Sequence, residues 1–312
     1  MDAAKIAALA ELAGDIAPVA LPLDPTTAMH VDGDYAAYYF SGNDETTLAS
    51  AKSKLITFVR DAKEIGGVGG QVIVHLSHGL SDKGGRFKIA SVKPYQGQRD
   101  SSRKPKNWEQ MRGWLEESKT LPGTDFRVVT WMDREADDGV AAAARYAWES
   151  GNMPVILSRD KDFRMIPGRH IVWTTLERHE IRPETWASTG PDSEVYGQKW
   201  FWMQMLAGDS ADNIPGLEKQ PAKQEGSFKD CGMACAEVRL MDATSPEAAY
   251  GIVKELYQGY YGASWADRFV EQAALLWLRV DNDAYVGDFM RAIPARDMAL
   301  ETALVKLEKR IR

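Results

Sequence analysis

The stretch Arg134-Glu135-Ala136-Asp137-Asp138-Gly139-Val140 places three carboxylates within four residues. It directly follows the apolar run 127–132 and opens an alanine-rich helical pattern. A strand end rich in carboxylates that feeds a helix suits a divalent cation, because Mg²⁺ takes oxygen ligands from a few carboxylates, water and phosphate. The alternative is an acidic first helical turn that complements the helix dipole.

Three further acidic segments favour the metal-site hypothesis. Asp32 ends a short apolar run, Asp160 and Asp162 follow another, and Asp209 and Asp212 lie in a loop rich in Gly, Ser, Asn and Pro. Each segment also has a plainer interpretation: an Asp-Gly turn, a surface charge cluster, or a turn between two helices. If residues 160–162 are extended, Asp160 and Asp162 point the same way and Lys161 points elsewhere.

The pattern of apolar residues predicts an α/β fold. Strands are expected at 28–31, 71–76, 127–132, 155–157 and 170–174, and helices at 3–13, 48–65 and 139–149. Such alternation is typical of a mostly parallel sheet covered on both faces, whose sites form beyond the carboxyl ends of the strands. We therefore expect the acidic segments at the strand ends to converge.

After about residue 190 the sequence no longer alternates between strand and helix patterns. Helical patterns follow one another at 196–206, 233–241, 246–257, 265–280 and 298–312. We therefore predict an α/β domain over 1–195 and a helical region over 196–312.

Composition limits the classes of function. The chain has 312 residues and a formal net charge of −7, which argues against nucleic-acid binding over the whole surface but allows local basic stripes. It has no apolar run of about 18 residues that would span a membrane. No signal peptide is evident at residues 1–5, so we expect a cytoplasmic protein, with Cys231 and Cys235 as ordinary thiols.

Residues 83–119 form a basic segment, with ten lysines and arginines against four carboxylates. Tyr95, Trp108 and Trp114 are interleaved with them, and cations with aromatic platforms suit a single strand or a frayed duplex end. The alternative is a solvated surface segment. Neutralising Arg99 and Arg103 should weaken DNA binding and flatten its salt dependence. The candidate DNA-binding residues are Arg86, Lys93, Tyr95, Arg99, Arg103 and Lys104.

In this order and spacing, the segments resemble the flap endonuclease / 5′→3′ exonuclease family, and most closely its short bacteriophage-encoded 5′→3′ exonucleases. The resemblance covers roughly residues 28–216. It is carried by Val31-Asp32-Gly33-Asp34, Pro94-Tyr95-Gln96-Gly97-Gln98-Arg99, Glu135-Ala136-Asp137-Asp138, Ser158-Arg159-Asp160-Lys161-Asp162-Phe163 and Gly208-Asp209-Ser210-Ala211-Asp212-Asn213-Ile214-Pro215-Gly216. Each motif alone is weak evidence for the family, but the motifs together at this spacing are strong evidence.

The resemblance implies a PIN-like core followed by a helix–three-turn–helix DNA-binding module. It also implies two Mg²⁺ or Mn²⁺ ions that hydrolyse phosphodiester bonds without a protein nucleophile. The implied ligands are Asp32, Glu135 and Asp137 for the first ion, and Asp160, Asp162 and Asp209 for the second, with Asp138 and Asp212 close by or acting through water. The basic segment would receive the 5′ end.

The implied activity is 5′→3′ DNA exonuclease or flap endonuclease action in phage or bacterial replication and recombination. The expected partners are DNA 5′ ends, flaps and nicked or gapped duplex, with an RNA–DNA hybrid as a further substrate, and a monomer is expected. The alternatives are a PIN-like ribonuclease and a catalytically weakened protein that binds DNA ends or junctions.

Departures from the family pattern motivate the last alternative. The second strand ends in Val74-His75-Leu76-Ser77, without the family's aspartate, and Asp82 is the nearest carboxylate downstream. Gln96 stands where the family has a lysine. Lys88 or Lys93 would have to reach into the site to supply that positive charge. The segment 217–230 is longer than the family's hairpin, where a monovalent cation can bind, so K⁺ near Asp209–Gly216 is a further candidate ligand. We expect His75 and His78 to have structural or phosphate-contacting roles, not a zinc site.

Overall fold

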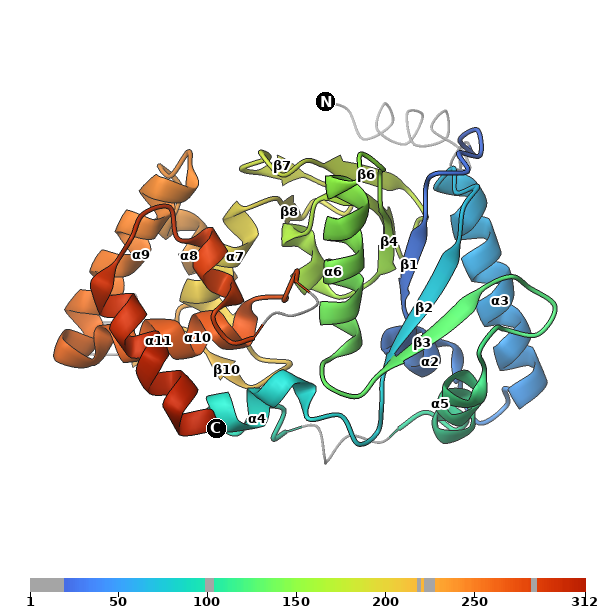
Figure 1. Cartoon of the computed structure of the whole chain (residues 1–312), viewed down its shortest axis with the longest axis horizontal. Coiled ribbons are helices and arrows are strands. Elements are labelled where there is room, and N and C mark those ends of the chain that lie inside the picture. Colours follow the sequence, from blue (N-terminus) through green and yellow to red (C-terminus); the bar gives the residue numbers. More distant parts are fainter. Residues whose placement is uncertain (1–19, 99–103, 218–219, 222–227, 282–284) are drawn as a thin grey trace, which may run out of the picture.

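The computed structural model describes residues 20–98, 104–217, 220–221, 228–281 and 285–312. The helix expected at 3–13 lies outside these residues, as do Arg99 and Arg103. A six-stranded sheet with the order β3-β2-β1-β4-β5-β6 dominates the first half of the chain (Figure 1). Its strands are β1 (Met29–Asp32), β2 (Val72–Ser77), β3 (Arg127–Trp131), β4 (Val155–Ser158), β5 (Gly168–Val172) and β6 (Arg178–Ile181).

The first five strands run parallel, and β6 is antiparallel to β5 at the edge. The predicted mostly parallel sheet is thus confirmed, although β6 was not expected. From β1 the chain adds β2 and β3 on one side and then β4 and β5 on the other. Ligands of open parallel sheets bind at such a switch point, which here lies between the carboxyl ends of β1 and β4.

Helices cover both faces of the sheet (Figure 1). One face carries α2 (Gly33–Phe40), α3 (Leu48–Ile65) and α5 (Trp108–Glu117), and the other carries α6 (Ala136–Glu149). Because strand side chains alternate between faces, Val155 and Leu157 join the core under α3, whereas Ile156 joins the core under α6.

The turn at the end of β1 is a helix start. Asp32 is the N-cap of α2, and its Oδ1 accepts a hydrogen bond of 2.9 Å from the backbone N–H of Tyr35. The simple Asp-Gly turn is therefore the wrong alternative, since an aspartate satisfies the free amides of a helix start as readily as those of a turn. Asp160 caps the 3₁₀ helix η3 (Lys161–Met165) in the same way.

The second half of the chain is helical, as expected. It contains α7 (Lys199–Ala207), α8 (Met233–Arg239), α9 (Pro246–Tyr261), α10 (Trp265–Leu276) and α11 (Met298–Ile311), with the 3₁₀ helices η4 (Gly262–Ser264) and η5 (Asp288–Ala292). Three two-stranded pairs accompany them: β7 (Ser188–Thr189) with β8 (Val195–Tyr196), β9 (Gly208–Asp209) with β10 (Ile214–Pro215), and β11 (Gln220–Pro221) with β12 (Phe228–Lys229).

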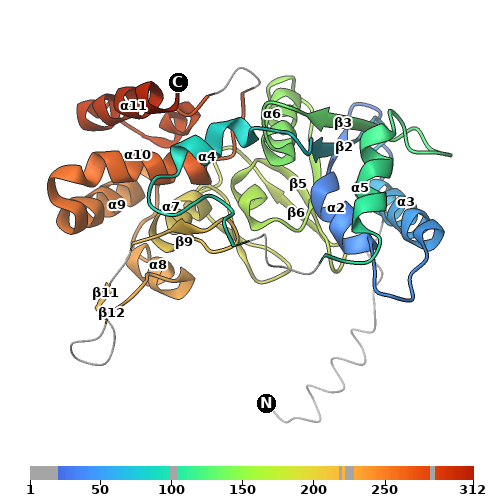
Figure 2. The same ribbon diagram turned by 90° about the horizontal axis from the view of Figure 1, so that it is seen from below.

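One hydrophobic cluster joins the two halves. It includes Val140 and Phe163 from the α/β half and Trp202 and Phe269 from the helical half. The basic segment begins with η1 (Lys83–Gly85) and α4 (Arg86–Ile89), and α4 lies against α10 and α11 (Figure 2). A domain boundary near residue 195 stays a prediction, and the cluster crosses it. Among the described residues, no helix is long and apolar enough to cross a membrane.

Candidate metal centre

Asp32 lies at the switch point of the sheet and is only 3 % exposed. Its Oδ2 accepts a hydrogen bond of 2.8 Å from Ser158 Oγ at the end of β4, so the ends of β1 and β4 share one polar contact. Burial and the nearby charges of Asp34 and Asp160 raise the pKa of Asp32 to about 7.

Asp137, in the first turn of α6, faces the same region. Burial raises the pKa of its carboxyl well above its usual value, and the charges of Asp32, Asp160 and Glu135 raise it further. Carboxylates repel one another in this way only at short range in a poorly solvated site. We call the four residues Asp32, Glu135, Asp137 and Asp160 the first carboxylate group.

A second carboxylate group consists of Asp162, Asp209 and Asp212. Each offers an oxygen that lies within 4.8 Å of the others, and no other trio in the described ranges meets at this spacing. Burial and then the charge of Asp160 raise the pKa of Asp162 well above its usual value, so the two groups adjoin at Asp160. Asp209 is buried and the other two are partly exposed, and mutually repelling carboxylates at this spacing form a donor set that fits hard divalent cations.

The β9–β10 hairpin holds two members of the second group. Gly208 has φ +69°, and a Cβ there would lie 2.3 Å from the backbone nitrogen of Gly216, so only glycine allows this close approach. Asp209 Oδ1 accepts a hydrogen bond of 2.8 Å from the N–H of Ala211 inside the hairpin. The carboxylates therefore project from a closed, internally bonded loop.

Lys161 points into the second group, and the expectation that it points elsewhere is wrong. Its Nζ lies 2.6 Å from Asp209 Oδ2 and 3.8 Å from Asp162 Oδ1. The alternation of an extended strand does not apply, because the chain turns into η3 directly after Asp160. Burial lowers the pKa of Lys161, but the charges of Asp162 and Asp209 outweigh this and raise it.

Tyr95 and Gln96 connect the two groups. The Tyr95 hydroxyl lies 2.8 Å from Glu135 Oε2 and 3.1 Å from Asp212 Oδ2. Gln96 Nε2 donates to Glu135 Oε1 at 3.2 Å and to Asp212 Oδ1 at 3.1 Å. Since Tyr95 is only 4 % exposed, its ring is not an accessible stacking platform for DNA.

Segment 94–98 is also bonded to the backbone of the hairpin. The N–H of Gln96 donates to Asp212 O at 2.9 Å, Asn213 Nδ2 donates to Pro94 O at 2.9 Å, and Gln98 Nε2 donates to Ala211 O at 2.9 Å. These carbonyl contacts already satisfy part of the hairpin, and K⁺ binding there stays a prediction.

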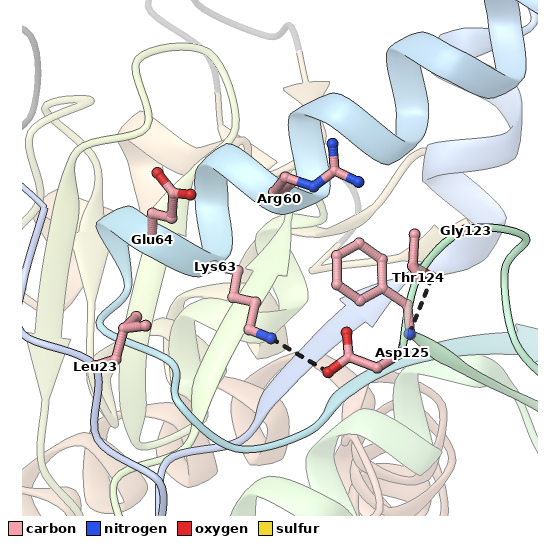
Figure 3. Close-up of a pocket in the computed structure, with 8 residues that line it drawn as sticks. Leu23, Arg60, Lys63, Glu64, Gly123, Thr124 and Asp125 are labelled. Atoms are coloured by element: carbon pink, nitrogen blue, oxygen red, sulfur yellow. Dashed lines mark hydrogen bonds and ion pairs between the residues drawn. The ribbon is translucent and has the colours of Figure 1, made fainter.

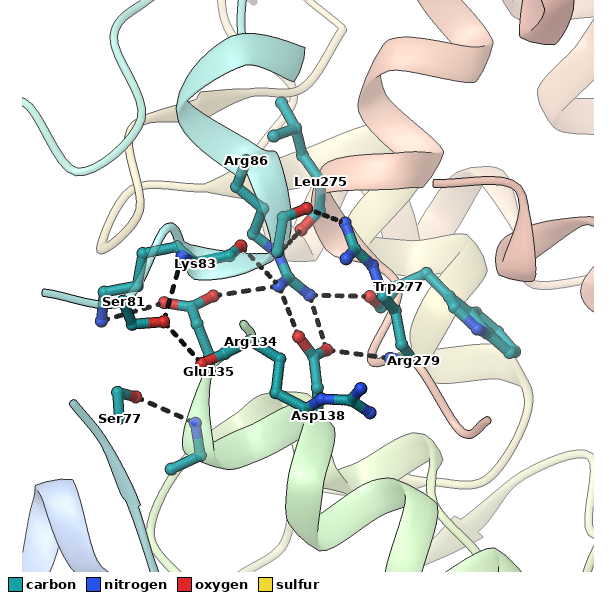
Figure 4. Close-up of polar contacts among 12 residues, drawn as sticks. Ser77, Ser81, Lys83, Arg86, Arg134, Glu135, Asp138, Leu275, Trp277 and Arg279 are labelled. Carbon is teal, nitrogen blue, oxygen red and sulfur yellow. Dashed lines mark hydrogen bonds and ion pairs between the residues drawn. The ribbon is translucent and has the colours of Figure 1, made fainter. Parts of the chain in front are cut away.

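Asp138 and Arg86 do not fit their predicted roles. Both are buried, and Arg86 donates two hydrogen bonds, of 2.7 and 2.8 Å, to the two oxygens of Asp138 (Figure 4). The N–H of Arg279 donates a third at 3.0 Å, and Arg86 also donates to Trp277 O. Burial raises the pKa of Asp138, but the guanidinium outweighs this and holds it below its usual value. Asp138 thus binds a protein cation, whose Nη1 also lies 3.2 Å from Glu135 Oε2 of the first group, and Arg86 is not exposed to DNA.

The other basic residues lie at different depths. Lys83 reaches the first group, with its Nζ 3.5 Å from Glu135 Oε1 (Figure 4). Lys88 instead donates to Ile311 O at 3.2 Å, whereas Lys93 is exposed. Lys104 is exposed and lies 4.0 Å from the centre of the Trp108 ring. Lys83 thus contacts the first group, as Lys161 contacts the second, while Lys88 is bonded at the end of α11 and does not replace the family's lysine. For Lys93 this role stays a prediction.

His75 in β2 and His78 just after it have different partners. His75 is buried and lies 3.1 Å from His30, while His78 accepts a hydrogen bond from the N–H of Leu80. Trp131 Nε1 also donates to His75 Nδ1 at 3.1 Å. His75 therefore links neighbouring strands through contacts with His30 on β1 and Trp131 on β3.

A cavity of about 620 Å³ lies between α3 and the loop 123–126, away from both carboxylate groups (Figure 3). Lys63 and Asp125 form an ion pair of 3.5 Å at its wall. None of the predicted site residues lines this cavity, so it has no part in the candidate centre.

Three residues that support the site were not found from the sequence: Ser77, Ser158 and Gln204. Gln204 is fully buried and donates a hydrogen bond of 2.6 Å to Asp162 Oδ1. Its signal was present, since it is the one polar residue in the apolar run 200–206. The two serines carry no comparable signal, because serine is common at strand ends.

Comparisons with known proteins bear on the fold. No protein-family model and no curated protein matches the chain. Among solved structures, the bacteriophage T5 protein co-crystallised with metal ions aligns with a TM-score of 0.57 at 17% identity, covering 92% of this chain and 100% of that one. The zinc-bound T5 5′-exonuclease aligns with a TM-score of 0.55 at 17% identity, covering 92% and 100% of the two chains.

A third structure is a T5 flap endonuclease variant in a pseudo-enzyme-product complex with DNA and metal ions. It aligns with a TM-score of 0.57 at 17% identity over 91% of this chain and 99% of that chain. These alignments extend over both the α/β half and the helical half. The chain therefore has the fold of the bacteriophage T5 5′-exonuclease and flap endonuclease.

Proposed function

We propose that this chain is a divalent-metal-dependent 5′→3′ DNA exonuclease and flap endonuclease of phage or bacterial replication and recombination. The observation that carries the proposal is the meeting of carboxylates from separate chain segments at the switch point of the sheet. The T5 structures with the same fold contain metal ions, and one contains DNA. Asp32, Glu135, Asp137 and Asp160 would hold one Mg²⁺ or Mn²⁺ ion, and Asp162, Asp209 and Asp212 a second.

Bound divalent ions would lower the pKa of an attacking water and stabilise the charge that develops on the scissile phosphate. The protein's own part is to hold the carboxylates in place. Tyr95 and Gln96 fix Glu135 and Asp212 relative to each other, while Gln204 fixes Asp162. Lys83, next to the first group, supplies a positive charge for a phosphate entering from the basic segment.

The test is cleavage of a duplex with a short 5′ flap, labelled at its 5′ end, with Mg²⁺, with Mn²⁺ and with EDTA. Metal-dependent release of mononucleotides or short oligonucleotides from the 5′ end supports the proposal, and product length separates exonuclease from flap cutting. The same duplex labelled at its 3′ end should lose no label early in the reaction. Release from the 3′ end, or cleavage in EDTA, contradicts the proposal.

A second candidate function is binding of DNA ends or junctions by a protein with weakened nuclease activity. The observation that favours it is the neutral Gln96 between Glu135 and Asp212, where a cation for the phosphate would be expected. Tight binding of the flap duplex without cleavage in either metal would support this candidate. A PIN-like ribonuclease would instead cut single-stranded RNA and leave the DNA flap intact.

A further inference from the structure

No acidic residue stands at the end of β2, but the carboxylate of Asp34 is hydrogen-bonded to the last residue of this strand. Asp34, in the first turn of α2, accepts hydrogen bonds at its Oδ2 from the Ser77 N–H at 3.2 Å and from Ser77 Oγ at 2.6 Å. Ser77 is the last residue of β2 and is 2 % exposed. The carboxylate of Asp34 is thus fixed to the strand end that the sequence leaves without an acid.

Ser77 passes this contact on to α6. Its Oγ accepts a hydrogen bond of 2.9 Å from the N–H of Ala136, which lies between Glu135 and Asp137 (Figure 4). Since a hydroxyl has one proton to donate and Ala136 already donates to it, the proton points to Asp34. Asp34 is therefore connected through one serine to the helix start that carries two members of the first carboxylate group.

Arg112 holds the other oxygen of Asp34. Its Nη1 lies 2.6 Å from Asp34 Oδ1, and its Nη2 contacts the carbonyl of Ser77. Arg112 belongs to α5, which lies within the basic segment 83–119. The charge of Asp34 is also felt in the first group, where it raises the pKa of both Asp32 and Asp137.

We propose that Asp34 is the carboxylate that serves the end of β2: a positioning residue that adds its charge to the first group and, through Ser77, holds the start of α6. This inference rests on the proposed metal-dependent function. Asp34 then contributes to divalent-ion affinity at the first group, and Asp82 does not. Asp82 is exposed and accepts a hydrogen bond from Gly84 N–H, so its contact serves its own turn.

The experiment measures Mn²⁺ binding to the full chain without DNA, by electron paramagnetic resonance or calorimetry. Asp34→Asn should lower the affinity for one of the bound Mn²⁺ ions by about tenfold, the usual effect of losing a residue that supports the ligands of a metal site. Asp82→Asn should bind as the wild type does. Arg112→Met breaks the ion pair of Asp34 but keeps the carboxylate, so it should not weaken Mn²⁺ binding by a comparable factor.

A swap variant tests the placement itself. Asp34→Ser combined with Ser77→Asp moves the carboxylate onto the strand, where it can still accept from the Ala136 N–H, and most of the lost affinity should return. Wild-type affinity in Asp34→Asn, or no recovery in the swap variant, overturns the inference. Mn²⁺ binding that follows these expectations without any DNA cleavage by the wild type would contradict the proposed nuclease and leave the role of Asp34 intact.

Discussion

Arg86 and Asp138 form a doubly hydrogen-bonded ion pair that is shielded from solvent, with Arg86 1 % and Asp138 0 % exposed. The pair joins the basic segment to α6, and the contacts of Arg86 with Leu275 O and Trp277 O extend it to the end of α10. Removal of one partner from such a buried pair is strongly destabilising, because it leaves the other charge buried without compensation.

Asp138→Asn should therefore lower the free energy of unfolding by about 3 kcal/mol, the lower end of the cost of breaking a buried pair. It should leave the number of bound Mn²⁺ ions unchanged, because the carboxylate faces Arg86. Urea unfolding and metal titration measure the two effects. Asp133→Asn is the matched control, since Asp133 is exposed and pairs only locally with Arg134. Loss of a bound ion in Asp138→Asn would return Asp138 to the metal ligands.

Asp162→Ala should abolish cleavage and spare DNA binding, because it removes a carboxylate of the second group without touching the basic segment. We expect the cleavage rate to fall at least about 10²-fold, the scale of one lost electrostatic contact to the transition state. Asp125→Ala, at the distant cavity of Figure 3, is the control and should cut at the wild-type rate. A variant at Asp162 that cuts normally would refute the assignment of the second group.

Gln96→Asn should weaken Mn²⁺ binding and slow cleavage while the fold stays stable. Gln96 has φ +55°, a conformation that asparagine adopts readily. The shorter side chain keeps the amide but cannot span Glu135 and Asp212 as Gln96 does. We expect a loss of about 10-fold in metal affinity, as for other outer contacts. Gln98→Asn, whose bonds go to loop carbonyls, serves as the comparison. Equal affinity of Gln96→Asn and the wild type would exclude the positioning role.

Lys161→Met should tighten Mn²⁺ binding to the second group. The ammonium of Lys161 is a cation inside the protein that competes with a divalent ion for Asp209. Its removal leaves the carboxylates more negative, and we expect the dissociation constant to fall by several-fold, from about 1 kcal/mol, the energy of two unit charges 4 Å apart in water. Calorimetry of the metal-free protein measures this, with the exposed Lys93→Met as control. Weaker binding in Lys161→Met would show that the lysine supports the site instead of competing for it.

Acid should destabilise the protein through His170. Burial lowers the pKa of His170 from 6.5 to about 4, and its Nε2 lies 2.8 Å from Ile166 O. The unfolded chain therefore takes up the proton first as the pH falls below 6.5, and stability is lost until the folded state is protonated near pH 4. Between pH 7.5 and 5 this histidine should cost about 2 kcal/mol.

His170→Gln isolates this contribution, because glutamine can donate to the same carbonyl but does not titrate. Urea unfolding in EDTA at the two pH values should show a smaller loss of stability in the variant than in the wild type by about 2 kcal/mol. Parallel losses in the two proteins would mean that His170 is not held neutral in the folded state.

Much of the fold follows from the sequence because the apolar periodicity is strong. The helix expected at 48–65 is observed with these bounds, and β2 and β3 deviate from expectation by one residue. Predictions from local sequence were wrong where one short pattern is compatible with two local conformations. Asp32-Gly33-Asp34 suits a turn and a helix start alike, and β6 (Arg178–Ile181) has too few apolar residues to stand out.

The candidate site was predictable as a set of segments, but not residue by residue. Asp137 and Asp138 are neighbours on a helix, so their side chains point about 100° apart and cannot both face one site. Which of them faces the acidic groups depends on how α6 rotates against the sheet, and that depends on Arg86, 52 residues away. Lys161 was misjudged for the same reason, since its partner Asp209 is distant in sequence, and Asp34, whose partner Ser77 is also distant, was given no role.

The hydrophobic cluster that unites Val140 and Phe163 with Trp202 and Phe269 has a consequence for how the molecule comes apart. A cut near residue 195 would strip apolar partners from both fragments, so neither should survive as an independent module. Melting of the helical half and loss of the metal centre should then be a single cooperative event. Proteins built in this way cannot exchange their helical half by simple recombination of gene segments, because those helices complete the hydrophobic core on the α6 side of the sheet.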